Sequence, residues 1–206
     1  MKNKKNKTGF LYRNFLEAWK YVGSNKNYLW LSIGFFVLFA VIAIVFPIPS
    51  QLEQSLQEML RKLAGRVIGL NTFETIALLF TNNFFVSLVG LFSGLIFCIG
   101  SFMIAMSNGY VIGYVIKLVI QQMGLHEGII SLWRLLPHGI FEIPAIMISL
   151  AVGLRLGVSL FNSLNAGNFK GIFDDLKNAV RVSFFVILPL LVIAAIIEGM
   201  LIGFGV

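Results

Sequence analysis

The sequence predicts an all-α, polytopic membrane protein: about five transmembrane helices in a compact bundle packed through glycines, with short amphipathic helices at the membrane surface. Three observations predict this class. Of the 206 residues, 58% are hydrophobic and 12% are charged, and the mean hydropathy is +0.88, whereas a soluble domain carries about 25% charged residues. Apolar runs long enough to cross a bilayer recur along the chain, and glycines recur at a spacing of four inside them.

The first 27 residues form a basic segment that we place in the cytoplasm. Seven of the 16 basic residues precede the first apolar run: Lys2, Lys4, Lys5, Lys7, Arg13, Lys20 and Lys26. Positive charge next to a membrane segment marks the cytoplasmic side and attracts anionic lipid headgroups. We therefore expect lipid headgroups, and no nucleic acid, as the partner of this segment.

The first transmembrane helix is predicted over residues 28–47, because Pro47 cannot continue a helix. Residues 48–81 are amphipathic, with Leu52, Leu56 and Leu63 on one helical face opposite charged and amide side chains. We interpret them as an external segment of one or two short helices lying on the membrane or capping the bundle.

Residues 82–206 form the predicted four-helix membrane core. The run 82–123 is too long for one span, so we expect two helices with a turn between Gly100 and Gly109. A short loop, a span at about 137–161, a polar segment at 162–181 and a last span kinked at Pro189 follow. The basic loop 162–181 is then cytoplasmic, and the C-terminus lies outside the cell membrane.

The spacing of glycines is the strongest packing signal. Seven Gly-Gly pairs occur at i, i+4, where chance would give about two. Four of these pairs fall inside the predicted core spans: Gly90/Gly94, Gly109/Gly113, Gly153/Gly157 and Gly199/Gly203. Glycines on one face let helix backbones approach closely in lipid. The first span has no such pair, so we expect it to pack outside the four-helix core.

Strongly polar side chains inside predicted spans are few, and each needs a partner or a function. His138 and Glu142 lie one helical turn apart, between Pro137 and Pro144. We predict a polar intramembrane network that joins five side chains: His138, Glu142, Asn82, Asn83 and Asn108. Three further groups are secondary candidates: Arg155, expected to reach the headgroups, and Lys117 and Glu198, expected near the outer helix ends.

His138 and Glu142 fit three kinds of chemistry. They can form a buried structural network, face an ion or substrate pathway, or serve acid-base or metal chemistry. Two candidate ligands fall short of the three or four that zinc needs, so we expect no metal or cofactor. The single Cys98 excludes a disulfide within the chain.

Two stretches resemble the stage II sporulation protein M family of integral membrane proteins. They are "FTNNFFVSLVGLFSGLIFCIGSFMIAMSNGYVIGYV" and "LLPHGIFEIPAIMISLAVGLRLG", and the match extends over about residues 75–205. The matching elements are the Asn82-Asn83 pair, Asn108-Gly109, the Pro-His-Gly-x-x-Glu block at 137–142 and Gly153…Arg155…Gly157.

This resemblance implies a scaffold, because the namesake holds a peptidoglycan-degrading partner and a transpeptidase-like partner at a membrane. Our leading hypothesis is therefore a non-enzymatic structural or scaffolding component of a cell-envelope complex, with membrane-protein partners or further copies of itself. The competing hypothesis is a small transporter or channel-like protein whose intramembrane site is His138/Glu142. A third is an intramembrane enzyme that uses the same two residues.

Overall fold

The computed structural model describes residues 9–203, except for the side chains of residues 127–129 and 131–138. Over this range the chain forms helices and no strand. Five of the helical stretches are long and apolar enough to cross a membrane: Lys26–Val45, Thr72–Leu95, Ile99–His126, Gly139–Ala166 and Lys170–Gly203. The predicted fold class and number of spans are confirmed, and the chain is a multi-pass membrane protein.

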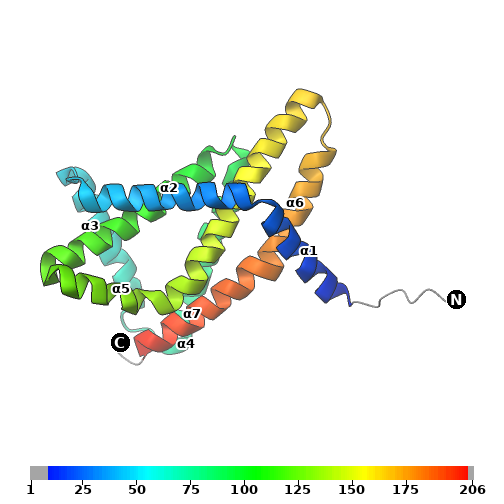
Figure 1. The fold of residues 1–206 in the computed structure, drawn as a ribbon. Coiled ribbons are helices and arrows are strands. Elements are labelled where there is room, and N and C mark those ends of the chain that lie inside the picture. The colour runs from blue at the N-terminus through cyan, green and yellow to red at the C-terminus, as the bar shows by residue number, and fades with distance from the viewer. Residues whose placement is uncertain (1–8, 204–206) are drawn as a thin grey trace.

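The N-terminal third contains three helices (Figure 1). Helix α1 (Phe10–Ser24) lies within the predicted basic segment, α2 (Lys26–Val45) is the first span, and α3 (Ser50–Val67) occupies the predicted external amphipathic segment. Among the residues of α3, Leu56 alone is buried. The exposure of α3 agrees with a helix at the membrane surface.

Helix α4 (Thr72–Phe92) begins ten residues before the predicted start of the core. Its first turn is capped by Asn71, whose Oδ1 accepts from the backbone N–H of Glu74, while the Glu74 carboxylate accepts from the N–H of Asn71. This reciprocal capping box fixes the helix start. Asn82 and Asn83 therefore lie in the middle of α4 and do not cap a helix.

The turn between the second and third spans lies at residues 93–98, so its predicted position between Gly100 and Gly109 was wrong. A short 3-10 helix, η1 (Ser93–Leu95), is followed by Phe97 and Cys98 with positive φ angles of 46° and 67°. Gly100 and Gly109 instead lie within a helix, where a side chain would overlap Ser93 and the backbone of Phe36 respectively. These glycines serve close packing rather than chain reversal.

Helix α5 (Ile99–Ala166) supplies the third and fourth spans and changes direction at Gly124. Gly124 has φ +86°, a conformation that glycine adopts without the steric cost that other residues meet. After Gly167, α6 (Lys170–Val182), the π-helical turn η2 (Ser183–Ile187) and α7 (Leu188–Gly203) form one long rod (Figure 1). The π-turn immediately precedes Pro189, which lacks the N–H donor of a regular helix.

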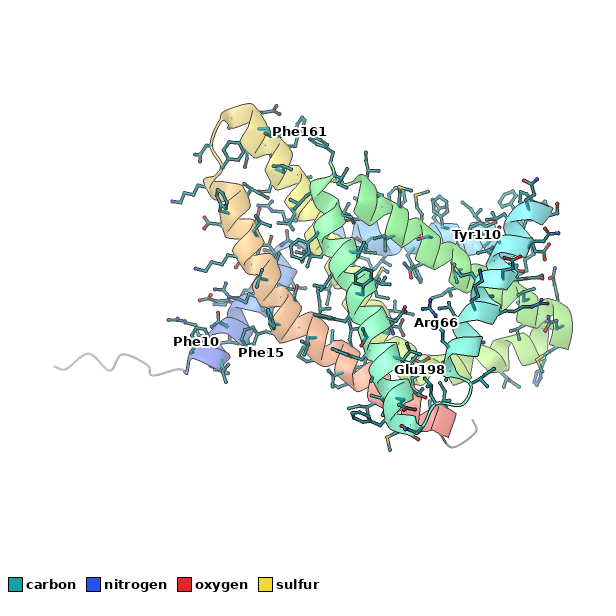
Figure 2. The ribbon with its side chains drawn as sticks, turned by 180° about the vertical axis from the view of Figure 1, so that it is seen from behind. Phe10, Phe15, Arg66, Tyr110, Phe161 and Glu198 are labelled. Atoms are coloured by element: carbon teal, nitrogen blue, oxygen red, sulfur yellow. The ribbon has the colours of Figure 1, made fainter. Side chains whose placement is uncertain are left out.

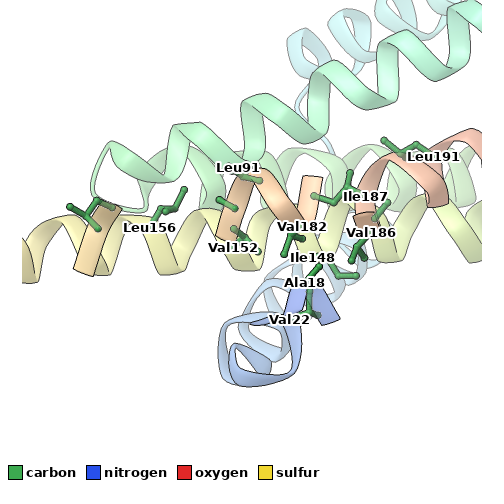
Figure 3. Packing of buried hydrophobic residues seen from close by; sticks show 13 residues of the cluster. Ala18, Val22, Leu91, Ile148, Val152, Leu156, Val182, Val186, Ile187 and Leu191 are labelled. Atoms are coloured by element: carbon green, nitrogen blue, oxygen red, sulfur yellow. The ribbon is translucent and has the colours of Figure 1, made fainter. Parts of the chain in front are cut away.

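The main hydrophobic core joins α1, α4, α5 and the α6–α7 rod (Figure 3). Val152 and Leu156 of α5 and Val182 of α6 are each at most 1% exposed. Leu91 of α4 and Ala18 of α1 belong to the same cluster. The amphipathic α1 is thus packed onto the bundle and is part of its core.

Helix α2 does not lie outside the bundle, contrary to our expectation. Its backbone at Phe36 and Ala40 lies against Gly109 and Gly113 of α5. Trp30, on the other side of α2, is 69% exposed. Because α2 is apolar all round, its sequence does not distinguish the packed face from the face turned to lipid.

Candidate functional site

A close backbone contact, which we call the seam, joins the end of α4 to the second half of α5 and is formed by Gly90, Gly94, Gly153 and Gly157. A Cβ atom on Gly94 would overlap the carbonyl group of Gly153, and one on Gly157 would overlap the carbonyl oxygen of Gly94. A Cβ on Gly153 would lie 2.6 Å from the carbonyl oxygen of Gly90. Backbone therefore packs directly on backbone along this seam.

Small polar side chains hydrogen-bond across the same seam to backbone carbonyls. Ser101 Oγ donates to Gly90 O at 2.7 Å, and Ser149 Oγ donates to Ser87 O. Cys98 Sγ lies 3.4 Å from Leu154 O. These groups are satisfied by neighbouring helices, so the seam is both tightly packed and internally hydrogen-bonded.

The remaining two glycine pairs also lie at helix contacts. Gly109 and Gly113 of α5 pack directly against the backbone of α2. On α7, a Cβ at Gly199 would overlap the side chain of Ile76, and one at Gly203 would lie 2.8 Å from Thr72 Oγ1. Two of the four predicted pairs therefore face each other at the seam. The third pair faces α2, and the fourth faces the first turns of α4.

The three asparagines of the predicted network bond locally. Asn82 Nδ2 donates to Asn83 Oδ1 at 3.4 Å, and Asn108 Nδ2 donates to Ile104 O at 2.8 Å within its own helix. Asn82 is exposed on the outer surface of α4. Within the part of the chain whose side chains are described, none of the three hydrogen-bonds to Glu142.

Glu142 of α5 lies close enough to Glu198 of α7 for their charges to interact. The side chain of His138 lies outside the described residues, so the network predicted around it remains a prediction. Among the side chains that are described, no three His, Cys, Asp or Glu residues are grouped to hold a metal ion. Figure 2 places Glu198 at the end of the molecule opposite Phe161.

Lys117 stabilises the end of the first span. Its Nζ donates to the carbonyl oxygen of Phe46, the residue after α2, at 2.6 Å. An ammonium group at a helix C-terminus satisfies a free carbonyl and complements the helix dipole. A hollow of about 390 Å³ next to this contact is lined in part by Glu53 and Gln121.

A groove runs on the outside of the bundle between α4 and α5, and we call it the outer groove. It encloses about 260 Å³ and is lined by Phe85, Val86, Val89, Ile104, Ser107 and Asn108. Asn82 lies three residues before Phe85, on the same face of α4. The Ser107 hydroxyl and the Asn108 amide both donate to Ile104 O, at 3.2 and 2.8 Å, and they lie at an otherwise apolar surface within the spans.

A second polar cluster joins α1, α5 and α6. Arg155 Nε donates to Asp175 Oδ2 at 3.1 Å, and the Tyr21 hydroxyl donates to Asp175 Oδ1 at 3.0 Å. Asp175 is 6% exposed. Burial, and next the carboxylate of Asp175, raise the pKa of the Tyr21 phenol above its ordinary value of 10.0. Tyr21 is therefore protonated at neutral pH and donates this hydrogen bond.

An ion pair fixes α1 to α6 beside this cluster. Arg181 contacts Glu17 at 2.8 Å through Nη2 and Asn14 at 2.9 Å through Nε. Neither Asp175 nor Arg181 was a predicted site residue, because both lie in a polar segment that looked like a solvated loop. The one available signal was Arg155, which pairs with Asp175, while its contact with the headgroups remains a prediction.

Comparison with known proteins identifies one family. The model of the family described as stage II sporulation protein M matches residues 32–201. No curated protein and no solved structure matches the chain. The matched region runs from the second turn of α2 to the last turn of α7.

Proposed function

The chain belongs to the stage II sporulation protein M family, and we propose that it is a non-enzymatic scaffold that holds another membrane protein in a cell-envelope complex. The single observation that carries this proposal is the outer groove, which is lined by the exposed Ser107 and the half-buried Asn108, with the exposed Asn82 one turn before the lining residue Phe85. A scaffold needs a rigid body and an exposed surface for a partner.

The rigid body is the seam between α4 and α5. Ser101 and Ser149 direct their hydroxyl groups to backbone carbonyls of α4, and glycine backbones fill the remaining space. Polar groups inside a membrane protein either face a water-filled pathway, as in a transporter, or bond to fixed partners within the protein. Ser101 and Ser149 do the second. The close packing of this seam supports a structural role for residues 82–206.

The exposed surface is the outer groove. An amide group has two donors and an acceptor with two lone pairs. Asn108 uses one donor on Ile104 O, and the Asn82–Asn83 contact is long at 3.4 Å. Hydrocarbon offers such groups no partner, whereas a side chain on a neighbouring transmembrane helix does. We therefore infer that a membrane-spanning helix of a partner protein, carrying a hydrogen-bonding side chain at mid-depth, occupies this groove.

The proposed orientation places the N-terminus and the α5–α6 connection in the cytoplasm and α3 and the C-terminus outside. It follows from the basic residues before α2, which mark the cytoplasmic side. Five spans put the two termini on opposite sides of the membrane.

Site-specific photocrosslinking in the native cell membrane tests the proposal. A photoreactive amino acid replaces Phe85 or Met103, which are 66% and 63% exposed beside the outer groove. The matched control position is Val37, 51% exposed on α2. We expect one membrane protein to be crosslinked from the groove positions and not from Val37, and we expect Asn82→Leu with Asn108→Leu to abolish that product.

Three outcomes contradict the proposal. Equal crosslinking from Val37 would mean that the groove has no special partner. A product of twice the chain mass would assign the groove to a second copy of this chain. Ion or solute flux through proteoliposomes that Glu142→Gln abolishes would favour the transporter hypothesis instead.

A further inference from the structure

A second hollow, separate from the outer groove, lies between the end of α5 and the start of α6, and we call it the hairpin hollow. It encloses about 460 Å³ and is lined by Arg155, Ser159, Asn162, Ser163, Ala166, Asn168, Gly171, Asp174 and Asp175. Figure 2 shows Phe161 projecting from the same tip of the molecule. Seven of the nine lining residues are polar or charged, so the hollow offers hydrogen-bonding groups to a ligand.

The hairpin hollow lies at the level where the spans end. Tyr28, in the first turn of α2, interacts with the guanidinium group of Arg155. The turn after α4 reaches the same level, because Cys98 lies against the backbone of Leu154 and Gly157. Two spans therefore end beside Arg155, and the hollow begins where hydrocarbon gives way to the lipid headgroups.

Unused hydrogen-bond donors point to a phosphate group. Ser159 and Ser163 are 8% and 4% exposed, and within the described part of the chain neither hydroxyl group has a hydrogen-bond partner. The Arg155 side chain is 42% exposed and commits its Nε to Asp175. Its guanidinium group also interacts with Tyr28 and Tyr21, and a guanidinium group has five N–H donors in all. A guanidinium group with neighbouring hydroxyl groups is a common way to bind a phosphate.

The charge of the hollow selects against a simple anion. Arg155 contributes one positive charge, whereas Asp174 and Asp175 contribute two negative charges. The Asp175 carboxylate is occupied by Arg155 and Tyr21, but the exposed Asp174 is not held by any hydrogen bond among the described residues. A carboxylate repels a phosphate and attracts an ammonium group. The lining therefore fits a ligand that carries both.

Apolar side chains are exposed on the faces of α5 and α6 that turn away from the polar lining. Phe161, Leu164 and Phe173 are 52%, 51% and 67% exposed on the same two helices. Aromatic and apolar groups at a membrane–water interface lie against acyl chains and the glycerol region of lipids. These residues do not line the hollow, so the choice of a lipid headgroup rests on the level of Arg155, beside which two spans end.

We propose that the hairpin hollow binds the headgroup of a phospholipid with a primary ammonium group, of the phosphatidylethanolamine type. The phosphate receives hydrogen bonds from Arg155, Ser159 and Ser163, and the ammonium group lies against Asp174. Binding would fix the α5–α6 connection to the lipid leaflet on the side of α1.

Native mass spectrometry of the detergent-purified full chain tests this inference. The protein is mixed with phosphatidylethanolamine, phosphatidylcholine or phosphatidylglycerol of identical acyl chains. We expect about tenfold stronger retention of phosphatidylethanolamine, since about 1.4 kcal/mol, the value of one good charged contact, corresponds to tenfold in affinity. Water-soluble glycerophosphoethanolamine is added as a competitor to separate the headgroup from the whole lipid.

Three variants sharpen the test. Asp174→Asn should remove the preference for phosphatidylethanolamine over phosphatidylcholine, and because Asp174 is exposed it should leave folding unchanged. Ser163→Leu should fill the hollow and reduce binding of all three lipids. Lys177→Gln is the matched control on α6, because Lys177 is exposed and does not line the hollow.

Two results would overturn the inference. One is equal retention of the three lipids by the unmodified chain, or an unchanged preference in Asp174→Asn. The other is displacement of phosphatidylethanolamine by an equal concentration of glycerophosphoethanolamine, which would assign the hollow to a soluble phosphoethanolamine compound. Neither outcome depends on Ser163→Leu, so a folding defect in that variant leaves the test intact.

Discussion

Replacing Gly153 with alanine should open the seam between α4 and α5. The new Cβ would lie 2.6 Å from the carbonyl oxygen of Gly90 and 2.8 Å from that of Leu91. A relaxed carbon–oxygen contact is about 3.3–3.6 Å. Both obstacles are backbone atoms, which cannot rotate aside as a flexible side chain can. The helices must therefore separate by roughly the difference of about 0.7 Å.

The cost follows from three contributions. Overpacking of a close contact costs about 1–3 kcal/mol. Gly90 O also accepts the hydrogen bond from Ser101 at 2.7 Å, and weakening one interhelical hydrogen bond in a membrane protein costs about 0.6 kcal/mol. Alanine stabilises the helix by up to about 1 kcal/mol relative to glycine, because its helix propensity is higher. The net loss is about 2 kcal/mol, or about a 30-fold larger population of the open seam.

Cys98 provides the assay, because it is the single cysteine of the chain and its Sγ lies at the seam, 3.4 Å from Leu154 O. Cys98 is partly exposed in the closed seam, so the unmodified chain sets a basal rate of maleimide labelling in detergent, and an increase above that rate reports opening of the seam. We expect Gly153→Ala to accelerate labelling above this basal rate and to lower the temperature of half-maximal labelling.

The matched control is Gly34→Ala in α2. A Cβ at Gly34 would meet nothing within 4 Å, so this variant receives the same gain in helix propensity without a clash. It should label as slowly as the unmodified chain. If Gly153→Ala and Gly34→Ala label at the same rate, direct backbone contact does not hold the seam and the reasoning fails.

Two further predictions concern the attachment of α1. Arg181→Gln removes the 2.8 Å ion pair with Glu17, so α1 should exchange its amide hydrogens faster by several-fold, whereas Lys177→Gln should leave that exchange unchanged; equal exchange in both variants would contradict this role. The raised pKa of Tyr21 means that its contact with Asp175 is present below pH 10 and is lost as pH rises through the folded-state pKa. Tyr21→Phe should therefore remove the last tyrosine ionisation from an alkaline absorbance titration; an unchanged titration would contradict the contact.

The transmembrane spans could be predicted from the sequence because the hydrophobicity of consecutive residues adds up along the chain. Twenty apolar residues in a row predict a transmembrane helix whatever their order, so α2 was placed within two residues of its observed start at Lys26. Glycine spacing likewise indicates a face, since two residues at i, i+4 share it. Neither signal says which neighbour that face meets, which is why α2 was placed outside the bundle although its backbone meets Gly109.

The start of α4 and the turn after it were misplaced for a related reason. Glycine and asparagine are common both in turns and in close helix contacts. The neighbouring residues in a single sequence do not distinguish a turn from a helix contact. Asn71 with Glu74 was the better signal, because a capping box needs two residues at a fixed spacing. The reversal itself uses positive φ at Phe97 and Cys98, residues for which no turn propensity would be assigned.

The polar cluster of Tyr21, Arg155 and Asp175 was beyond sequence reasoning because its members are far apart in the chain. Tyr21 and Asp175 are separated by 154 residues, and their meeting depends on how α1 packs on α6. An acid beside an arginine gives that arginine a partner within the protein, and the sequence did not indicate this partner. The pairing with Asp175 holds Arg155 in the wall of the hairpin hollow. A hollow built this way depends on α1, and so the loss of Tyr21 should weaken lipid selectivity as well as the attachment of α1.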